Sequence, residues 1–70
     1  MKAYKKGDVL RLPNSYENGF ATCIGVYPDC YHWRLSFDNA GYFINKDLDQ
    51  YQELMQRLAY DPQYQGFTPC

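Results

Sequence analysis

At 70 residues the chain is long enough for one small domain and too short for a large hydrophobic core. Its formal net charge of −1 gives no electrostatic reason to expect nonspecific binding to phosphate backbones or acidic membranes. No apolar run approaches the ~18 residues that a membrane span needs, and no apolar segment of a secretion signal follows the first methionine. We therefore expect a soluble, cytoplasmic protein.

The first half of the chain alternates in the manner of β-strands. Residues 7–12 are a short apolar-rich run between a glycine and a proline, which predicts a first strand with Val9 in the core. A turn signal, Asn18-Gly19, leads into a second predicted strand over residues 19–27. In that strand one face is the more β-branched, and we expect it to point into the core; it consists of Phe20, Thr22, Ile24 and Val26.

The cleanest alternation of the chain predicts a third strand over residues 31–37. Its apolar face, which we expect to be the core face, consists of Tyr31, Trp33, Leu35 and Phe37. The segment Asp38-Asn39-Ala40-Gly41 is typical of a tight hairpin turn, and residues 42–45 are the expected return strand.

Helical spacing replaces strand alternation after residue 46. We predict a helix over residues 47–60, capped by Asp47 with Gln50 completing a capping box. Its apolar residues follow at helical spacing and are Leu48, Tyr51, Leu54, Met55 and Leu58. Pro62 ends the helix, and residues 61–70 are predicted to be an irregular tail of the single domain 1–70.

This order of elements, together with two short motifs, resembles small SH3-like barrels of the Tudor and KOW kind. The motifs are Lys6-Gly7-Asp8-Val9-Leu10 at the start and Leu35-Ser36-Phe37-Asp38-Asn39-Ala40-Gly41 near the end, and the resemblance covers residues 5–49. It implies a mainly β fold: a small antiparallel barrel of four to five strands with one C-terminal helix. The alternative is an α+β domain in which the helix covers one face of a three- or four-stranded sheet.

Cysteine and histidine are too few and too poorly spaced to predict chemistry. Cys23, Cys30, Cys70 and His32 are the only candidates for a zinc site, and they lack the paired Cys-x-x-Cys arrangement of zinc ribbons. A nucleophilic Cys-His pair would lack an orienting third residue. We therefore predict no metal site, no cofactor and no enzymatic activity.

Aromatic residues are the most informative feature, because there are one tryptophan, four phenylalanines and eight tyrosines. If the alternating apolar residues make the core, several tyrosines have no obvious burial site and are candidates for a contact surface. The candidate partner surface consists of Tyr4, Tyr16, Tyr27, Tyr42 and Tyr64, together with Arg11 and Arg34.

Such a surface, without strong basicity, favours a protein partner. The leading hypothesis is a small intracellular interaction module, acting as an adaptor or as a stand-alone, phage-type inhibitor of a larger protein machine. Homodimerisation through the helix or an edge strand stays open. The alternative is a nucleic-acid-binding barrel that uses Lys5, Lys6, Arg11, Arg34 and neighbouring tyrosines.

Overall fold

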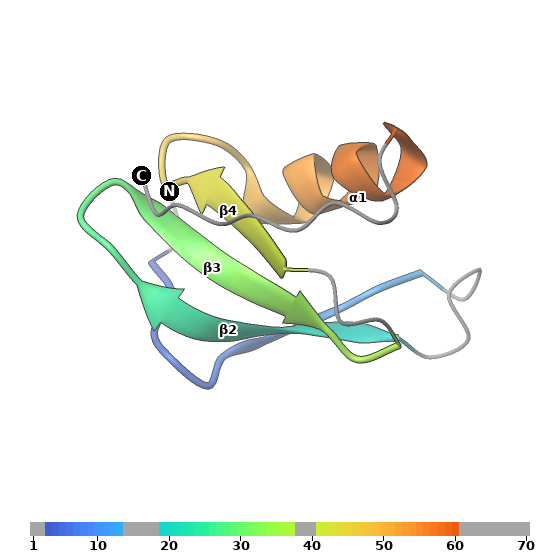
Figure 1. Ribbon diagram of the computed structural model, residues 1–70, viewed down its shortest axis with the longest axis horizontal. Helices are drawn as coiled ribbons and strands as arrows, with labels where there is room; N and C mark the ends of the chain where they lie inside the picture. The colour runs from blue at the N-terminus through green and yellow to red at the C-terminus, as the bar shows by residue number, and fades with distance from the viewer. Residues whose placement is uncertain (1–2, 14–18, 38–40, 61–70) are drawn as a thin grey trace.

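The fold is one antiparallel sheet of four strands followed by a helix (Figure 1). The structure, a computed structural model, describes residues 3–13, 19–37 and 41–60. Each strand pairs with the next along the chain, so the sheet order is β1-β2-β3-β4. The elements are β1 (Val9–Arg11), β2 (Phe20–Val26), β3 (Cys30–Leu35), β4 (Gly41–Asn45) and α1 (Gln50–Tyr60).

The predicted fold class, mainly β with one C-terminal helix, is confirmed. Each of the four strands lies within its predicted segment or begins one residue before it. The third strand stops at Leu35, and Phe37 beyond it is 48% exposed instead of lying in the core. The hairpin turn and the tail were predicted at 38–41 and 61–70; residues 38–40 and 61–70 lie outside the described part of the chain.

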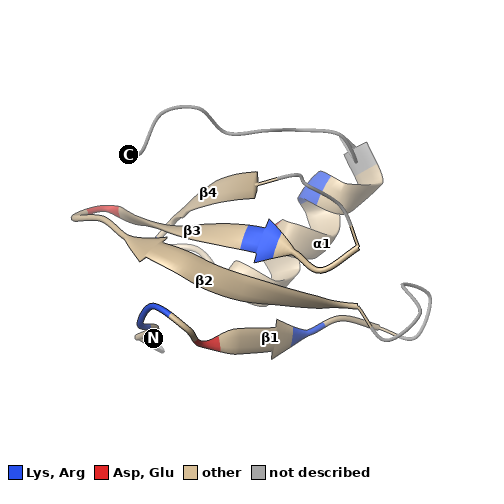
Figure 2. Ribbon diagram, turned by 60° about the horizontal axis from the view of Figure 1, so that its bottom comes forward, with Lys and Arg blue, Asp and Glu red and all other residues tan. Residues whose placement is uncertain are grey.

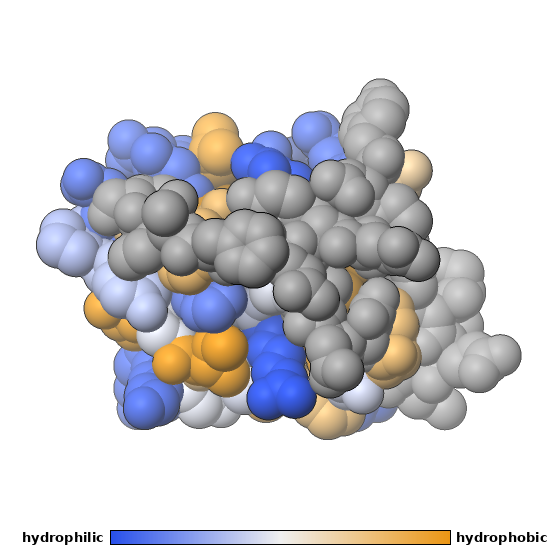
Figure 3. Space-filling model, in the orientation of Figure 1, coloured by the Kyte–Doolittle hydropathy of each residue, from blue (hydrophilic) through white to orange (hydrophobic). Residues whose placement is uncertain are grey.

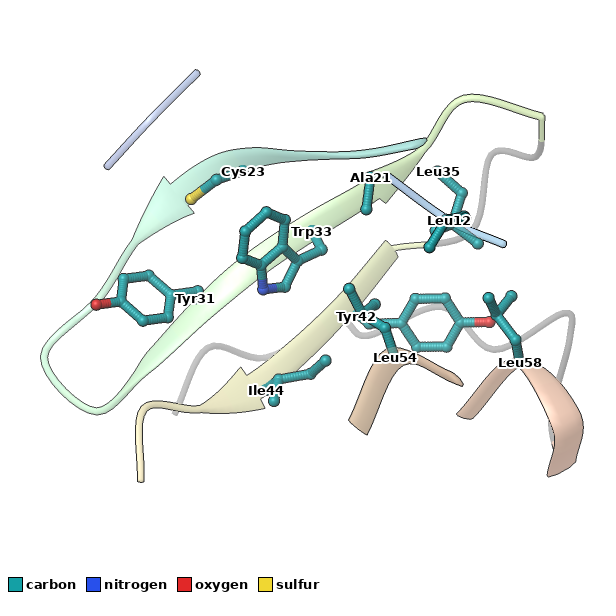
Figure 4. Close-up of a cluster of buried hydrophobic side chains, with 10 residues drawn as sticks. All are labelled: Leu12, Ala21, Cys23, Tyr31, Trp33, Leu35, Tyr42, Ile44, Leu54 and Leu58. Carbon is teal, nitrogen blue, oxygen red and sulfur yellow. The ribbon is translucent and has the colours of Figure 1, made fainter. Parts of the chain in front are cut away.

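One face of the sheet, the inner face, carries the core. Tyr31, Trp33 and Leu35 all point inward from β3, and Trp33 is completely buried at the centre of the cluster (Figure 4). Tyr42 and Ile44 extend the same face on β4, where they lie opposite Trp33 and Tyr31. The alternation predicted for the third strand is therefore correct from residue 31 to residue 35.

The predicted core face of β2 is wrong. The residues that point inward are the small ones, Ala21 and Cys23, both fully buried, whereas Phe20 and Ile24 are exposed. The reason is steric: Cys23 lies directly opposite Trp33, and a small side chain there leaves room for the indole ring. The larger β2 side chains consequently lie on the outer face of the sheet.

A β-bulge in β2 changes the alternation partway along the strand. Cys23 pairs with Trp33 and Gly25 pairs with His32, so Ile24 is an additional residue in the ladder. Val26, predicted to be in the core, is 47% exposed at the end of the strand. Val9 of β1, also expected in the core, is 50% exposed because it lies opposite the outward-facing Thr22.

The helix covers the inner face beside β4, as the α+β alternative expected (Figure 1). Leu54 and Leu58, one turn apart, are buried against this face, and the ring of Tyr42 points toward Leu58 (Figure 4). Tyr42 is thus a core residue, and its predicted place on a partner surface is wrong. Leu48 and Tyr51, predicted to belong to the buried stripe, are exposed.

The helix begins three residues later than predicted, at Gln50, and its cap is Asp49 instead of Asp47. The Asp49 carboxylate accepts a hydrogen bond from the Gln52 amide at 3.1 Å, which is the usual N-cap contact. Asp47 belongs to the preceding turn, where its amide donates to Asn45 Oδ1.

Gln50 is the one buried polar residue of the described core, and none of its buried nitrogen or oxygen atoms lacks a hydrogen-bond partner. Its Oε1 accepts the indole N–H of Trp33 at 2.9 Å. Its Nε2 donates to the carbonyl oxygens of Asn45, at 2.8 Å, and Leu48, at 3.0 Å. One side chain therefore joins the centre of the sheet, the end of β4 and the first turn of the helix.

We expect Gln50→Ala to lower the free energy of unfolding by roughly 2–3 kcal/mol, because it leaves the buried Trp33 indole N–H without a partner and removes two further hydrogen bonds, to the carbonyls of Asn45 and Leu48. Gln56→Ala is the matched control, since Gln56 is an exposed glutamine of the same helix and its loss should change stability by less than about 0.5 kcal/mol. Urea unfolding followed by Trp33 fluorescence measures both. Equal stability of the two variants would contradict this role of Gln50.

Candidate binding surface

The outer face of the sheet, opposite the core, presents exposed side chains from three neighbouring strands. In one cross-strand row Val9 lies beside Thr22, and Thr22 lies beside Arg34. On one side of this row Arg11 lies opposite Phe20, and on its other side Ile24 lies at the bulge. We call this group the outer patch; it consists of Val9, Arg11, Phe20, Thr22, Ile24 and Arg34.

The outer patch combines apolar and cationic groups. Val9, Phe20 and Ile24 are each more than a third exposed, and neighbouring strands only ~5 Å apart bring their side chains into one surface. Figure 3 shows apolar atoms at the surface over β2, beside strongly hydrophilic ones. Contiguous apolar surface edged by arginine is a typical composition for protein contact sites.

Backbone contacts hold the patch rigidly. The Phe20 amide donates to Ser36 Oγ at 3.0 Å, and the Ser36 amide donates to the Phe20 carbonyl at 2.9 Å. The Cys23 amide donates to the Asp8 carbonyl at 2.8 Å, which fixes the start of β1 against β2. A preformed surface loses little conformational entropy when it binds.

The described charges are distributed unequally around the sheet. Basic segments lie before β1, at its end, toward the end of β3 and in α1 (Figure 2). The described acidic residues away from β1 lie in the β2–β3 turn and around the start of the helix; they are Asp29, Asp47, Asp49 and Glu53. The two charged residues of the outer patch, Arg11 and Arg34, are thus both basic, in a chain whose net charge is close to zero.

A second group of side chains on the outer face packs within the chain itself. The His32 ring stacks on Phe43 with 3.9 Å between centroids, and the Tyr27 ring is tilted against Phe43 at 5.8 Å. Gly41 lets the imidazole lie close to β4, because a Cβ there would be 2.7 Å from His32 Nε2. Burial lowers the pKa of His32 below its usual value.

The structure separates the predicted surface residues into three groups. Arg11 and Arg34 lie together in the outer patch. Tyr27 belongs to the His32–Phe43 cluster and stays half-exposed. Tyr42 is in the core, and the predicted Tyr16 and Tyr64 lie outside the described residues.

The Tyr4 ring packs against the buried core from the surface. Its ring meets those of Tyr31, at 5.5 Å, and Trp33, at 5.1 Å, edge to face, and its amide donates to the Tyr31 hydroxyl. Burial, and to a smaller extent the negative charge of Asp49, raises the pKa of Tyr4. Its ring therefore acts mainly in packing, although it remains half-buried at the surface.

Sequence reasoning missed the apolar members of the outer patch, Val9, Phe20 and Ile24, because it assigned them to the core. The available signal was the size of the neighbouring residues. Ala21 and Cys23 alternate with the larger residues of β2, and only small residues fit opposite a buried tryptophan.

Cys23 and His32 lie on opposite faces of the sheet, so they do not form a nucleophilic pair. Cys23 faces Trp33 in the core, whereas His32 stacks on Phe43 outside it. Burial raises the pKa of the Cys23 thiol, whose Sγ donates to the Gly25 carbonyl at 3.4 Å. Within residues 3–13, 19–37 and 41–60, no three His, Cys, Asp or Glu side chains gather as metal ligands would.

Comparison of the chain with protein-family models, with curated proteins and with solved structures found no match. The resemblance to SH3-like barrels thus stays a prediction. Among the described residues, no helix is both long and apolar enough to cross a membrane.

The partly buried position of His32 predicts that acid destabilises the fold. His32 is the only histidine. Above its unfolded pKa of about 6.5 it is neutral in both states, and as the pH falls the unfolded state binds the proton first, because the folded pKa is lower. Stability present near pH 7 should therefore decline toward about pH 5.

His32→Phe keeps the aromatic stack and removes the titrating group, so we expect a smaller decline over the same range. Urea unfolding at both pH values measures the difference between the two proteins. An identical decline in both would show that other groups cause the acid sensitivity.

Proposed function

We propose that this protein is a small protein-binding module that contacts its partner through the outer patch. The observation that carries the proposal is the placement of Phe20, Ile24 and Val9 on the solvent side of a sheet whose other side is filled by Trp33 and the helix. Exposing these large apolar groups to water has a free-energy cost, which a partner would remove by covering them.

The partner is expected to be a protein because apolar area and arginine occur together. Arg11 beside Phe20 provides a cation and an aromatic ring in neighbouring positions, and both residue types are enriched in protein interfaces. The module acts by occupying a surface, either as an adaptor between proteins or as a stand-alone, phage-type inhibitor of a larger protein machine. The buried, protonated thiol of Cys23 suits a reducing, cytoplasmic setting.

A nucleic acid is the second candidate, and one observation favours it. Arg11 and Arg34 lie on the same face as Phe20, which is the combination of cation and ring that binds single strands. The near-zero net charge weighs against it, because such binding depends on neutralising phosphates.

Two double variants test the proposal. Phe20→Ser with Ile24→Ser removes the apolar centre of the outer patch. Leu48→Ser with Tyr51→Ser removes two equally exposed apolar residues near the start of the helix, away from the patch, and is the matched control. We expect a protein captured by the wild-type chain from its native lysate to be lost with the first variant and retained with the second.

Binding of the purified partner should weaken at least about tenfold in the patch variant, as expected when interface anchors are removed. Equal capture by both variants would contradict the proposal, as would a lysate that contains no binding protein. Capture that is abolished by nuclease, with steep salt dependence of oligonucleotide binding, would establish the nucleic-acid alternative instead.

A further inference from the structure

The strand β1 forms one edge of the sheet, and its backbone alternates between paired and unpaired groups. The Asp8 carbonyl accepts the Cys23 amide at 2.8 Å, and the Leu12 amide donates to the Gly19 carbonyl at 3.0 Å. In an antiparallel ladder the residues between such contacts direct their amides and carbonyls to the opposite side. Val9 and Arg11 therefore present their backbone groups at the outer edge of the sheet.

No strand lies along this edge in the part of the chain that the structure describes. Val9 and Arg11 are also exposed, so neither side chain shields the edge completely. Unpaired donors and acceptors in an extended strand can pair with a strand from another chain.

A tight turn before β1 fixes the edge in position. The Asp8 amide donates to the Lys5 carbonyl at 3.0 Å, and the Lys5 amide donates to the Asp8 carboxylate at 3.0 Å. Gly7 has a φ of 99°, a conformation that other residues rarely adopt, and its amide donates to the Cys23 carbonyl. The edge is thus extended before any partner binds, which lowers the entropic cost of pairing.

The charges around the outer edge of β1 determine which charge a strand from another chain should carry in order to pair there. Lys5, Lys6 and Arg11 are exposed in or beside β1, and these three cations outnumber Asp8, the one described acidic residue next to the strand. A second copy of this chain would bring the same three cations alongside its own, which repels. An acidic strand from another protein is attracted by these cations.

We propose that the outer edge of β1 binds an extended, acidic segment of the protein partner by strand addition. This inference rests on the proposed function and names the partner's chemistry. Residues directly opposite each other share a face, so the partner residue beside Arg11 is acidic and the residue two positions away, beside Val9, is aliphatic. The aliphatic side chain then continues the apolar surface of the outer patch.

Val9→Pro and Val9→Ala form the central comparison. Both variants lose the valine side chain, but only proline removes the outward amide, and it removes no bond to β2. The probes are two capped hexapeptides of threonine that carry, at their second and fourth positions, either glutamate and valine or lysine and valine, so that the charged and the aliphatic side chain share one face. Backbone amide shifts in NMR spectra at low ionic strength report where and how tightly each binds.

We expect the glutamate peptide to shift the amides of β1 and to bind about tenfold more weakly to Val9→Pro than to Val9→Ala, since one hydrogen bond is lost. The lysine peptide should bind at least about tenfold more weakly than the glutamate peptide. Arg11→Glu provides a second test if the proline variant does not fold, and it should reverse the preference between the peptides.

Strand addition is overturned if the two Val9 variants bind alike, if both peptides bind the wild-type protein equally, or if shifts occur only outside β1. A dimer that forms through β1 at rising concentration would also overturn it, because the occupant would be a second copy. If a captured partner is lost with Phe20→Ser and Ile24→Ser but binds both Val9 variants equally, strand addition fails while the proposed function stands. If the patch variant still binds, the proposed function itself fails.

Discussion

The hydrogen bond from the Trp33 indole to Gln50 is the contact on which the arrangement of sheet and helix depends. The donor lies at the centre of the inner face and the acceptor at the first residue of the helix, 2.9 Å away. A buried indole N–H without a partner is costly, so the position of Trp33 fixes where the helix must begin. The same glutamine then binds the carbonyls of Asn45 and Leu48 and holds the connection from β4 in place.

The buried tryptophan also determines which side of β2 faces outward. Its ring needs small neighbours, and Cys23 lies directly opposite it with Ala21 two residues before. The larger residues of the strand, such as Phe20, consequently lie on the outer face, where they join Arg11. The surface proposed for binding is therefore a consequence of how the core is packed.

The sequence predicted the elements well and their faces less well. Strict alternation around Trp33 located β3 and its core side, because polar and apolar residues there differ clearly. In β2 both faces are largely apolar, so periodicity could not choose between them, and the bulge at Ile24 interrupted the pattern. A choice based on β-branched residues selected the wrong face.

Other features depended on contacts between distant residues. The cap at Asp49 could not be distinguished from Asp47, since both are aspartates before a helical pattern. Gln50 was assigned to a capping box because its partner, Trp33, lies 17 residues away in sequence. Tyr42 was placed on the surface because nothing in its local sequence shows that the helix covers it.

The candidate site was predicted only in part. Arg11 and Arg34 were identified and do lie on one face. The tyrosines that appeared to be in surplus serve different purposes: Tyr4 and Tyr42 complete the core, and Tyr27 packs against Phe43. Sequence alone cannot separate these roles, because a tyrosine is suited to both a small core and a contact surface.

The inward orientation of Ala21 and Cys23 is the central claim, since both the core and the outer patch follow from it. Nuclear Overhauser contacts from the Trp33 ring test it most directly. We expect contacts from the indole to Gln50, Tyr4 and Cys23, and slow exchange of its N–H with solvent. Contacts from the indole to the side chains of Phe20 and Ile24, with a rapidly exchanging N–H, would contradict it.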